Sequence, residues 1–148
     1  MNLPQRVLVV DDDPIQRAVL QQIFTKHGSV AVETAADGIH AIAIVEGSVE
    51  AFDLIVLDLQ MPQYDGIEFM AYLESQIVEA RILLISGLPQ KFVRMSTTLA
   101  EAGGLRTIGF LNKPIRLEEL LAMVGGQAWR GNKPAKSGSD EAMRVGLG

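Results

Sequence analysis

Short apolar runs alternate with segments of helical periodicity along most of the chain. Three runs are continuous and about four residues long: Val7–Val10, Leu54–Leu57 and Ile82–Ile85. Such runs are typical of strands that are buried on both faces, as in a parallel sheet covered by helices. Two further candidates, Val30–Thr34 and Thr107–Leu111, mix polar with apolar residues, which favours strands at the edges of a sheet.

The first predicted helix has both a start and a stop signal. Asp13 is suited to be its N-cap, Pro14 to be its first helical residue, and Gln16 to complete a capping box. Gly28 stands where a helix commonly ends. Between these signals the apolar residues recur at helical spacing, at Ile15, Val19, Leu20, Ile23 and Phe24.

Four more helices are predicted in the same way. Asp37 opens the second, Asp65 with Glu68 forms a capping box for the third, and the fourth runs from about Pro89 to Ala102. The fifth has Glu118 and Glu119 in its first turn, where the helix dipole favours acids. Their apolar positions are Ile42 and Val45, then Ile67, Met70 and Leu73, then Phe92, Met95 and Leu99, then Leu117, Leu120, Leu121 and Val124.

Five strand–helix units follow from this pattern, and right-handed crossovers place helices on both faces of a five-stranded parallel sheet. We therefore expect a doubly wound α/β domain over residues 1–124. After it the composition changes, because residues 125–148 contain six glycines and no periodicity. We expect a flexible tail there, with Trp129 folding back on the last helix.

Composition narrows the class of protein. The chain has 148 residues, a net charge of −5, no cysteine and no run of Lys or Arg. These features exclude disulfides and thiol chemistry, argue against direct nucleic-acid binding, and fit a single domain in a reducing compartment. No apolar stretch approaches the roughly 20 residues of a membrane span, and no signal peptide is evident. We expect a cytoplasmic protein.

Chemically useful side chains follow four of the five strands. In a doubly wound sheet, sites lie beyond the carboxyl ends of the strands. The residues at these ends are Asp11 and Asp12 after the first strand, Asp58 after the third, Ser86 after the fourth, and Lys113 with Pro114 after the fifth. The sequence thus predicts one site that contains carboxylates, a hydroxyl and an ammonium group.

Such a cluster of carboxylates calls for a counter-charge. Two carboxylates about 4 Å apart repel each other by about 4 kcal/mol at an effective dielectric constant near 20. Because only oxygen ligands are present, a hard divalent cation, Mg²⁺ or Mn²⁺, is expected at Asp11, Asp12 and Asp58. Protonation of one carboxylate is the alternative, which Lys113 would oppose. A divalent cation, a carboxylate nucleophile, an ammonium group and a hydroxyl together are suited to phosphoryl transfer.

Four motifs resemble the receiver domain of two-component response regulators. The resemblance covers about Arg6 to Val124 and implies the flavodoxin-like strand order 2-1-3-4-5. The motifs are Val9–Asp13 (VVDDD), Leu57–Pro62 (LDLQMP) with Asp65 and Gly66, Ile85–Gly87 (ISG), and Gly109–Pro114 (GFLNKP).

The resemblance implies a role for each acidic residue. Asp58 would be the phosphoacceptor, phosphorylated by a sensor histidine kinase or a histidine phosphotransfer protein. Asp12 would be the direct metal ligand, Asp11 would act largely through water, and the backbone carbonyl of Gln60 would complete the ligands. The chain would then be no enzyme with a separate substrate, but a phosphoacceptor that assists its own phosphorylation and dephosphorylation.

The same resemblance implies a switch. Lys113 would pair with Asp58 and then with the phosphoryl group, and the hydroxyl of Ser86 would bond a phosphoryl oxygen. Phe110 would turn inward in response, and Gly87 would leave room for the phosphodonor. Pro114 would follow a cis peptide bond, and the face formed by the fourth helix, fifth strand and fifth helix would carry the signal to a downstream protein.

The chain departs from the family pattern at several positions. Ser86 replaces the commoner Thr, Phe110 has no phenol hydroxyl, and the pairing of Gln60 with Leu88 leaves the phosphoryl lifetime open. The glycine-rich end has no room for an output domain. We therefore expect a stand-alone receiver that is a monomer or a weak, phosphorylation-linked dimer, without contact to nucleic acid or membrane.

Three other functions remain as alternatives. A haloacid-dehalogenase-type phosphatase would use Asp11 and Asp13 as its Asp-x-Asp motif, with Asp11 as nucleophile, but it would leave Asp58 without a role. A flavodoxin-type cofactor binder would need a phosphate loop where three aspartates stand. A degenerate receiver that acts only as a binding module is the third.

Overall fold

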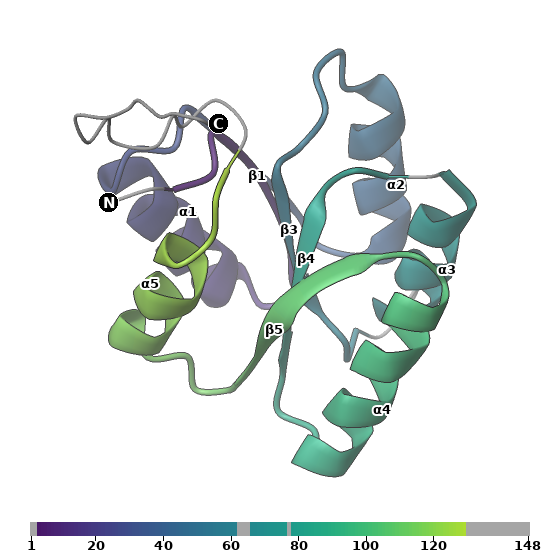
Figure 1. The fold of residues 1–148 in the computed structure, drawn as a ribbon. Coiled ribbons are helices and arrows are strands. Elements are labelled where there is room, and N and C mark those ends of the chain that lie inside the picture. Colours follow the sequence, from purple (N-terminus) through teal and green to yellow (C-terminus); the bar gives the residue numbers. More distant parts are fainter. Residues whose placement is uncertain (1–2, 62–65, 77, 130–148) are drawn as a thin grey trace, which may run out of the picture.

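A five-stranded parallel sheet forms the centre of the molecule (Figure 1). The computed structural model describes residues 3–61, 66–76 and 78–129. The strand order is β2-β1-β3-β4-β5, which confirms the predicted doubly wound sheet and its mixed-polarity edge strands. The strands are β1 (Arg6–Val10), β2 (Ala31–Ala35), β3 (Leu54–Asp58), β4 (Arg81–Ser86) and β5 (Arg106–Asn112).

Helices cover both faces of this sheet. Figure 1 shows α1 (Pro14–Lys26) and α5 (Leu117–Gly125) on one face, and α2 (Gly38–Gly47), α3 (Gly66–Gln76) and α4 (Gln90–Ala102) on the other. Successive strand residues point to opposite faces, so the continuous apolar runs divide between two cores. In β1, Val7 and Val9 pack with the α1 and α5 side, whereas Leu8 and Val10 pack with the α2–α4 side.

The predicted caps are largely present. The side chain of Asp13 accepts a hydrogen bond from the Ile15 N–H, and that of Asp37 accepts one from the His40 N–H. The predicted capping box at Gln16 is wrong, since within the described residues its side chain makes no bond back to Asp13. Gly28 has a φ of +117°, the left-handed conformation that glycine adopts freely after a helix. Asp65, the predicted cap of the third helix, lies outside the described residues.

Four predicted apolar faces differ in part from the structure. Ile15 and Val19 on α1 and Leu117 on α5 are exposed. On α3, Ile67 is exposed although Met70 and Leu73 are buried as predicted. On α4, the helix packs on the sheet through Val93, Ser96 and Ala100, and the larger apolar residues Phe92, Met95 and Leu99 face solvent. Small side chains let a helix approach a sheet closely. Val93, Ser96 and Ala100 therefore decide which side of α4 packs on the sheet, and its largest apolar residues do not.

The ordered fold continues beyond the expected domain boundary at Val124. Trp129 is buried, its indole N–H donates to the Val124 carbonyl over 2.9 Å, and the Arg81 guanidinium lies 5.3 Å from its ring centroid. The prediction that Trp129 folds back on the last helix is confirmed, and the expected tail therefore begins at least five residues too early. Residues 130–148 lie outside the described part. Among the described residues, no helix combines the length and apolar character that a membrane span requires.

Candidate functional site

The carboxyl edge of the sheet gathers the predicted acidic residues. Asp11 and Asp12 follow β1, and Asp58 ends β3, the neighbouring central strand. One carboxylate oxygen from each lies within 4.8 Å of the other two. Asp11 and Asp58 are buried and Asp12 is exposed, so the cluster has one solvent-facing acid above two buried ones.

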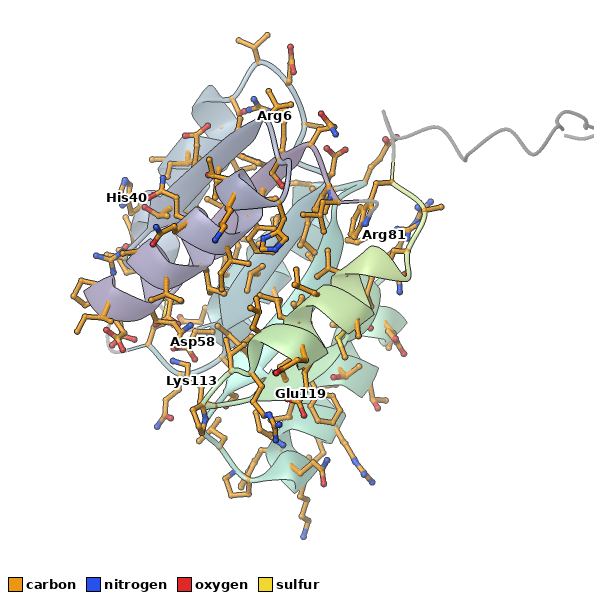
Figure 2. All side chains as sticks on the ribbon, turned by 90° about the vertical axis from the view of Figure 1, so that its left-hand side faces the viewer. Arg6, His40, Asp58, Arg81, Lys113 and Glu119 are labelled. Atoms are coloured by element: carbon orange, nitrogen blue, oxygen red, sulfur yellow. The ribbon has the colours of Figure 1, made fainter. Side chains whose placement is uncertain are left out.

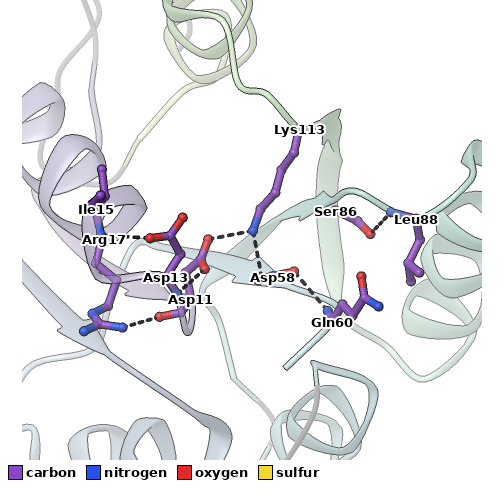
Figure 3. A network of polar contacts seen from close by, with 9 residues as sticks. All are labelled: Asp11, Asp13, Ile15, Arg17, Asp58, Gln60, Ser86, Leu88 and Lys113. Atoms are coloured by element: carbon purple, nitrogen blue, oxygen red, sulfur yellow. Dashed lines mark hydrogen bonds and ion pairs between the residues drawn. The ribbon is translucent and has the colours of Figure 1, made fainter. Parts of the chain in front are cut away.

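Lys113, at the end of β5, holds the two buried acids together (Figure 3). Its ammonium nitrogen lies 2.9 Å from Asp58 Oδ2 and 3.2 Å from Asp11 Oδ2. Burial acts to lower the pKa of Lys113, but the hydrogen bond to Asp58 and the charges of Asp58 and Asp11 outweigh it, so that pKa is raised. Lys113 is therefore a firmly charged partner for both carboxylates.

The structure disfavours the ionised form of the Asp58 carboxyl. Burial raises the pKa of its carboxyl, and the nearby charge of Asp11 adds to that rise. The Gln60 N–H and Lys113 act in the opposite direction without cancelling it. A buried carboxylate with a raised pKa beside other acids gains from any cation or electrophile that removes its charge.

Backbone donors fix the orientation of both buried carboxylates. The Asp13 N–H donates to Asp11 Oδ1, and the Gln60 N–H donates to Asp58 Oδ1, each over 2.9 Å. The loop after β3 depends on Gly66, because a Cβ there would lie 2.5 Å from the Asp58 carbonyl oxygen. A side chain at this position would push the acidic site apart.

Arg17 also supports the site, although the sequence pattern did not single it out. Its guanidinium donates to the backbone carbonyl of Asp11 over 2.7 Å, from the first turns of α1 (Figure 3). An arginine four residues after the N-cap Asp13 is the one available signal, because that spacing returns a long side chain to the loop before the helix. It fixes the loop that carries the acids.

The remaining predicted residues surround this centre. Ser86 is fully buried at the end of β4, where its Oγ accepts the Leu88 N–H over 2.8 Å. Gly87 lines the same opening as Asp12, Asp58, Gln60 and Lys113. Phe110 is half-buried on β5 and packs against the core on the α2–α4 side. The Lys113–Pro114 peptide bond is cis.

The residues present fit a hard divalent cation. Asp11 Oδ2 is buried and receives no hydrogen bond within the described structure, although the Lys113 ammonium is near it. Two more carboxylates lie within 4.8 Å, and the Lys113 charge alone cannot neutralise three acids. An oxygen-only set of this kind is suited to Mg²⁺ or Mn²⁺.

Comparison with known proteins agrees with this geometry. The family model for the response regulator receiver domain matches residues 7–125. The transcriptional regulatory protein TcrA of Mycobacterium tuberculosis is 35% identical over 129 residues, which are 87% of this chain and 48% of TcrA. The chain thus spans about half the length of the curated relatives it matches.

Solved structures give the same result. A response regulator from Colwellia psychrerythraea has a TM-score of 0.70 and 33% identity, with 82% of this chain and 94% of that chain covered. The CheX–CheY–BeF3–Mg complex from Borrelia burgdorferi has a TM-score of 0.71 and 30% identity, with 82% and 87% covered. By sequence, fold and family match, the chain belongs to the receiver domain family of two-component response regulators.

Proposed function

We propose that Asp58 is the phosphoacceptor of this receiver domain, and that a sensor histidine kinase or a histidine phosphotransfer protein supplies the phosphoryl group. One observation carries the proposal. Asp58 is a buried carboxylate that lies beside Asp11 and Asp12, bonds Lys113, and still lines the opening of the site. Asp11 is not among the described residues that line that opening, and this argues against the phosphatase alternative with Asp11 as nucleophile.

The reaction exchanges one bond to phosphorus for another. A carboxylate oxygen of Asp58 attacks the phosphorus of the phosphohistidine, the P–N bond breaks, and the imidazole leaves with the electron pair and takes up a proton. The Gln60 N–H and Lys113 hold the carboxylate in place for this attack. Lys113 and the Ser86 hydroxyl then bond the phosphoryl oxygens, which balances the charge that has arrived.

A divalent cation supports this step in the proposal. Asp11, Asp12, Asp58 and the backbone carbonyl of Gln60 would hold Mg²⁺ or Mn²⁺. When bound, the ion would neutralise the charge of the carboxylates and of the incoming phosphoryl group. Asp11 Oδ2 is buried and, among the described residues, has only the Lys113 ammonium, shared with Asp58, beside it, and this supports a cation here.

The surface beside the site suits a helical phosphodonor protein. Ile15 and Val19 on α1 are both exposed, and Ile15 lies two residues after Asp13 of the acidic loop. Pro114, next to Lys113, is exposed as well. Apolar side chains around a charged site are typical of a docking surface. We place the protein in the cytoplasm, where such donors would phosphorylate it, and propose no separate catalytic turnover.

Signalling is proposed to run through the face formed by α4, β5 and α5. Ser86 ends β4, which pairs with β3 and its final residue Asp58, and the Ser86 hydroxyl accepts the Leu88 N–H in the segment that leads into α4. Drawing that hydroxyl toward a phosphoryl group frees space beside Phe110. A phenylalanine ring can fill this space without losing a hydrogen bond.

Intact-mass spectrometry tests the proposal. We expect the protein to gain one phosphoryl group from acetyl phosphate with Mg²⁺, and none in EDTA. Asp58→Asn should gain none, whereas Asp37→Asn, which keeps its helix cap, should match the wild type. Stoichiometric phosphorylation of Asp58→Asn, or of the wild type in EDTA, would overturn the assignment.

A further inference from the structure

Arg17 contacts the acidic loop at both of its ends. This loop, Asp11, Asp12 and Asp13, connects β1 to α1. The Arg17 guanidinium donates to the Asp11 carbonyl oxygen over 2.7 Å (Figure 3), and the Arg17 backbone N–H donates to the Asp13 carbonyl oxygen over 3.0 Å. The second bond belongs to the first turn of any helix, whereas the first bond requires this side chain. Asp12 therefore lies between two residues whose carbonyls bond the same arginine.

The side chain of Asp12 is held differently from those of its neighbours. The Asp13 N–H donates to Asp11 Oδ1, and the Ile15 N–H donates to Asp13 Oδ1, each over 2.9 Å. The Asp12 carboxylate is exposed, and among the described residues none donates a hydrogen bond to it or forms an ion pair with it. The backbone of the loop alone decides where this carboxylate lies.

The peptide that joins Asp11 to Asp12 is the part of the backbone that Arg17 holds. On the side of the sheet, the Asp11 N–H donates to the Ala35 carbonyl oxygen at the end of β2 over 3.1 Å. On the side of α1, the Asp11 carbonyl accepts the Arg17 guanidinium. A peptide unit is planar, so the direction of its carbonyl also fixes the residue that follows. If the guanidinium is removed, this plane can turn and the Asp12 carboxylate turns with it.

We propose that Arg17 is a positioning residue for the divalent cation. By holding the Asp11 carbonyl, it keeps the Asp12 carboxylate where that group can bind the ion together with Asp58. This inference rests on the proposed cation site, and it adds a residue that reaches the site only through the backbone. Groups that orient metal ligands without touching the metal commonly change its affinity by roughly 10- to 100-fold.

The charge of Arg17 acts against its hydrogen bond. A guanidinium stays protonated in proteins, and this one lies beside a loop of three acids. Without a metal its charge offsets part of the repulsion among the carboxylates, and toward an incoming cation it is repulsive. If charge were its whole effect, removing Arg17 would strengthen cation binding. Because a positioning role predicts weaker binding, the direction of the change separates the two.

Binding of Mn²⁺ to the full chain tests the proposal. The free ion is followed by electron paramagnetic resonance at a temperature where thermal melts show that every variant is folded. We expect Arg17→Ala to raise the Kd for Mn²⁺ about tenfold, and Arg17→Lys, which keeps a charge and a donor on a shorter side chain, about threefold. Lys26→Ala removes the same charge from the exposed last turn of α1 and should leave the Kd unchanged. An unchanged or lower Kd in Arg17→Ala overturns the proposal. If that variant does not fold, an unchanged Kd in Arg17→Lys does so.

The wild type and Asp12→Ala separate this inference from the site on which it rests. A wild type that binds no Mn²⁺, or an Asp12→Ala variant that binds it as tightly as the wild type, overturns the cation site and the role of Arg17 together. If the wild type binds Mn²⁺, Asp12→Ala does not, and Arg17→Ala binds as tightly as the wild type, only the role of Arg17 fails. A merely structural role would lower the melting temperature in EDTA and leave the Kd unchanged.

Phosphorylation by acetyl phosphate gives a second comparison. In Arg17→Ala we expect a slower reaction than in the wild type at limiting Mg²⁺, and a rate near that of the wild type at saturating Mg²⁺, because a filled site no longer depends on affinity. A loss of rate that is equal at both concentrations would mean that Arg17 acts after the metal has bound. That result would also overturn the proposal.

Discussion

Replacing Asp58 by Asn should stabilise the metal-free protein. The Asp58 carboxylate is 2% exposed and has an oxygen within 4.8 Å of oxygens from Asp11 and Asp12. Burial is the main reason that its pKa is raised, so the folded state disfavours the ionised form. An amide removes the charge, and its oxygen can still accept the Gln60 N–H.

The size of the effect follows from opposing charges. At 4.8 Å and an effective dielectric constant near 20, one pair of carboxylates repels by about 3.5 kcal/mol. The Lys113 ammonium at 2.9 Å attracts by about 6 kcal/mol on the same basis. The repulsions from Asp11 and Asp12, together with the cost of burying the Asp58 charge, slightly exceed the attraction of Lys113. We expect Asp58→Asn to gain about 1–2 kcal/mol, or roughly 3–7 °C in melting temperature.

The gain should depend on pH in a defined direction. The pKa of Asp58 is raised above its ordinary value of 3.8, so the penalty is absent at lower pH and appears as pH rises through the folded-state pKa. Thermal melts in EDTA across pH 4 to 8 should therefore show the gap between variant and wild type opening with pH. Saturating Mg²⁺ should close it, because an ion at about 100 times its Kd adds about 2.7 kcal/mol to the wild type.

A matched control separates this effect from a general loss of negative charge. Glu50→Gln removes an exposed acid whose contact to Arg6 is 3.9 Å long, and its stability should change by less than about 0.5 kcal/mol. If Asp58→Asn instead melts below the wild type in EDTA at neutral pH, its bonds to Lys113 and Gln60 outweigh the repulsion. The electrostatic reasoning would then be wrong.

Three further predictions concern the surroundings of the site. Gly66→Ala should destabilise the fold by about 1–3 kcal/mol in chemical denaturation, because its Cβ would meet backbone at 2.5 Å, whereas Gly47→Ala, with open space, should not; equal effects would contradict this. Trp129→Ala should cost about 3–5 kcal/mol in the same assay, and a loss below 1 kcal/mol would show that this ring is not part of the core. On addition of beryllofluoride, amide shift changes should extend from Asp58 through Ser86–Phe92 and Thr107–Leu117. Changes confined to the acidic loops would exclude the proposed signalling face.

The fold was predictable because three of its five strands, β1, β3 and β4, are continuous apolar runs. Val7–Val10 and Ile82–Ile85 are each within one or two residues of β1 and β4, since residues buried on both faces leave no polar interruption. The side of α4 that packs on the sheet was not predictable in this way. Its apolar stripe and its buried side differ, because Ser96 and Ala100 permit a closer approach to the sheet than Met95 or Leu99 would.

The candidate site was predictable for a topological reason. Strand order alone brings Asp11, Asp58 and Lys113 to one edge, whatever their separation in sequence. The supporting role of Arg17 was not predicted, because its guanidinium donates to the backbone carbonyl of Asp11. A pattern of side chains does not show where such acceptors lie. The raised pKa of Asp58 likewise depends on burial, which only the folded structure reveals.

Locating the acyl phosphate on the chain tests the central claim most directly. After phosphorylation by acetyl phosphate in Mg²⁺, borohydride reduction converts a phosphorylated aspartate to homoserine, which peptide mass spectrometry can place. We expect homoserine at position 58 alone, and none when EDTA is present. Homoserine at position 11 or 12 in place of position 58, or labelling that persists in EDTA, would contradict the assignment of Asp58 as the metal-dependent phosphoacceptor.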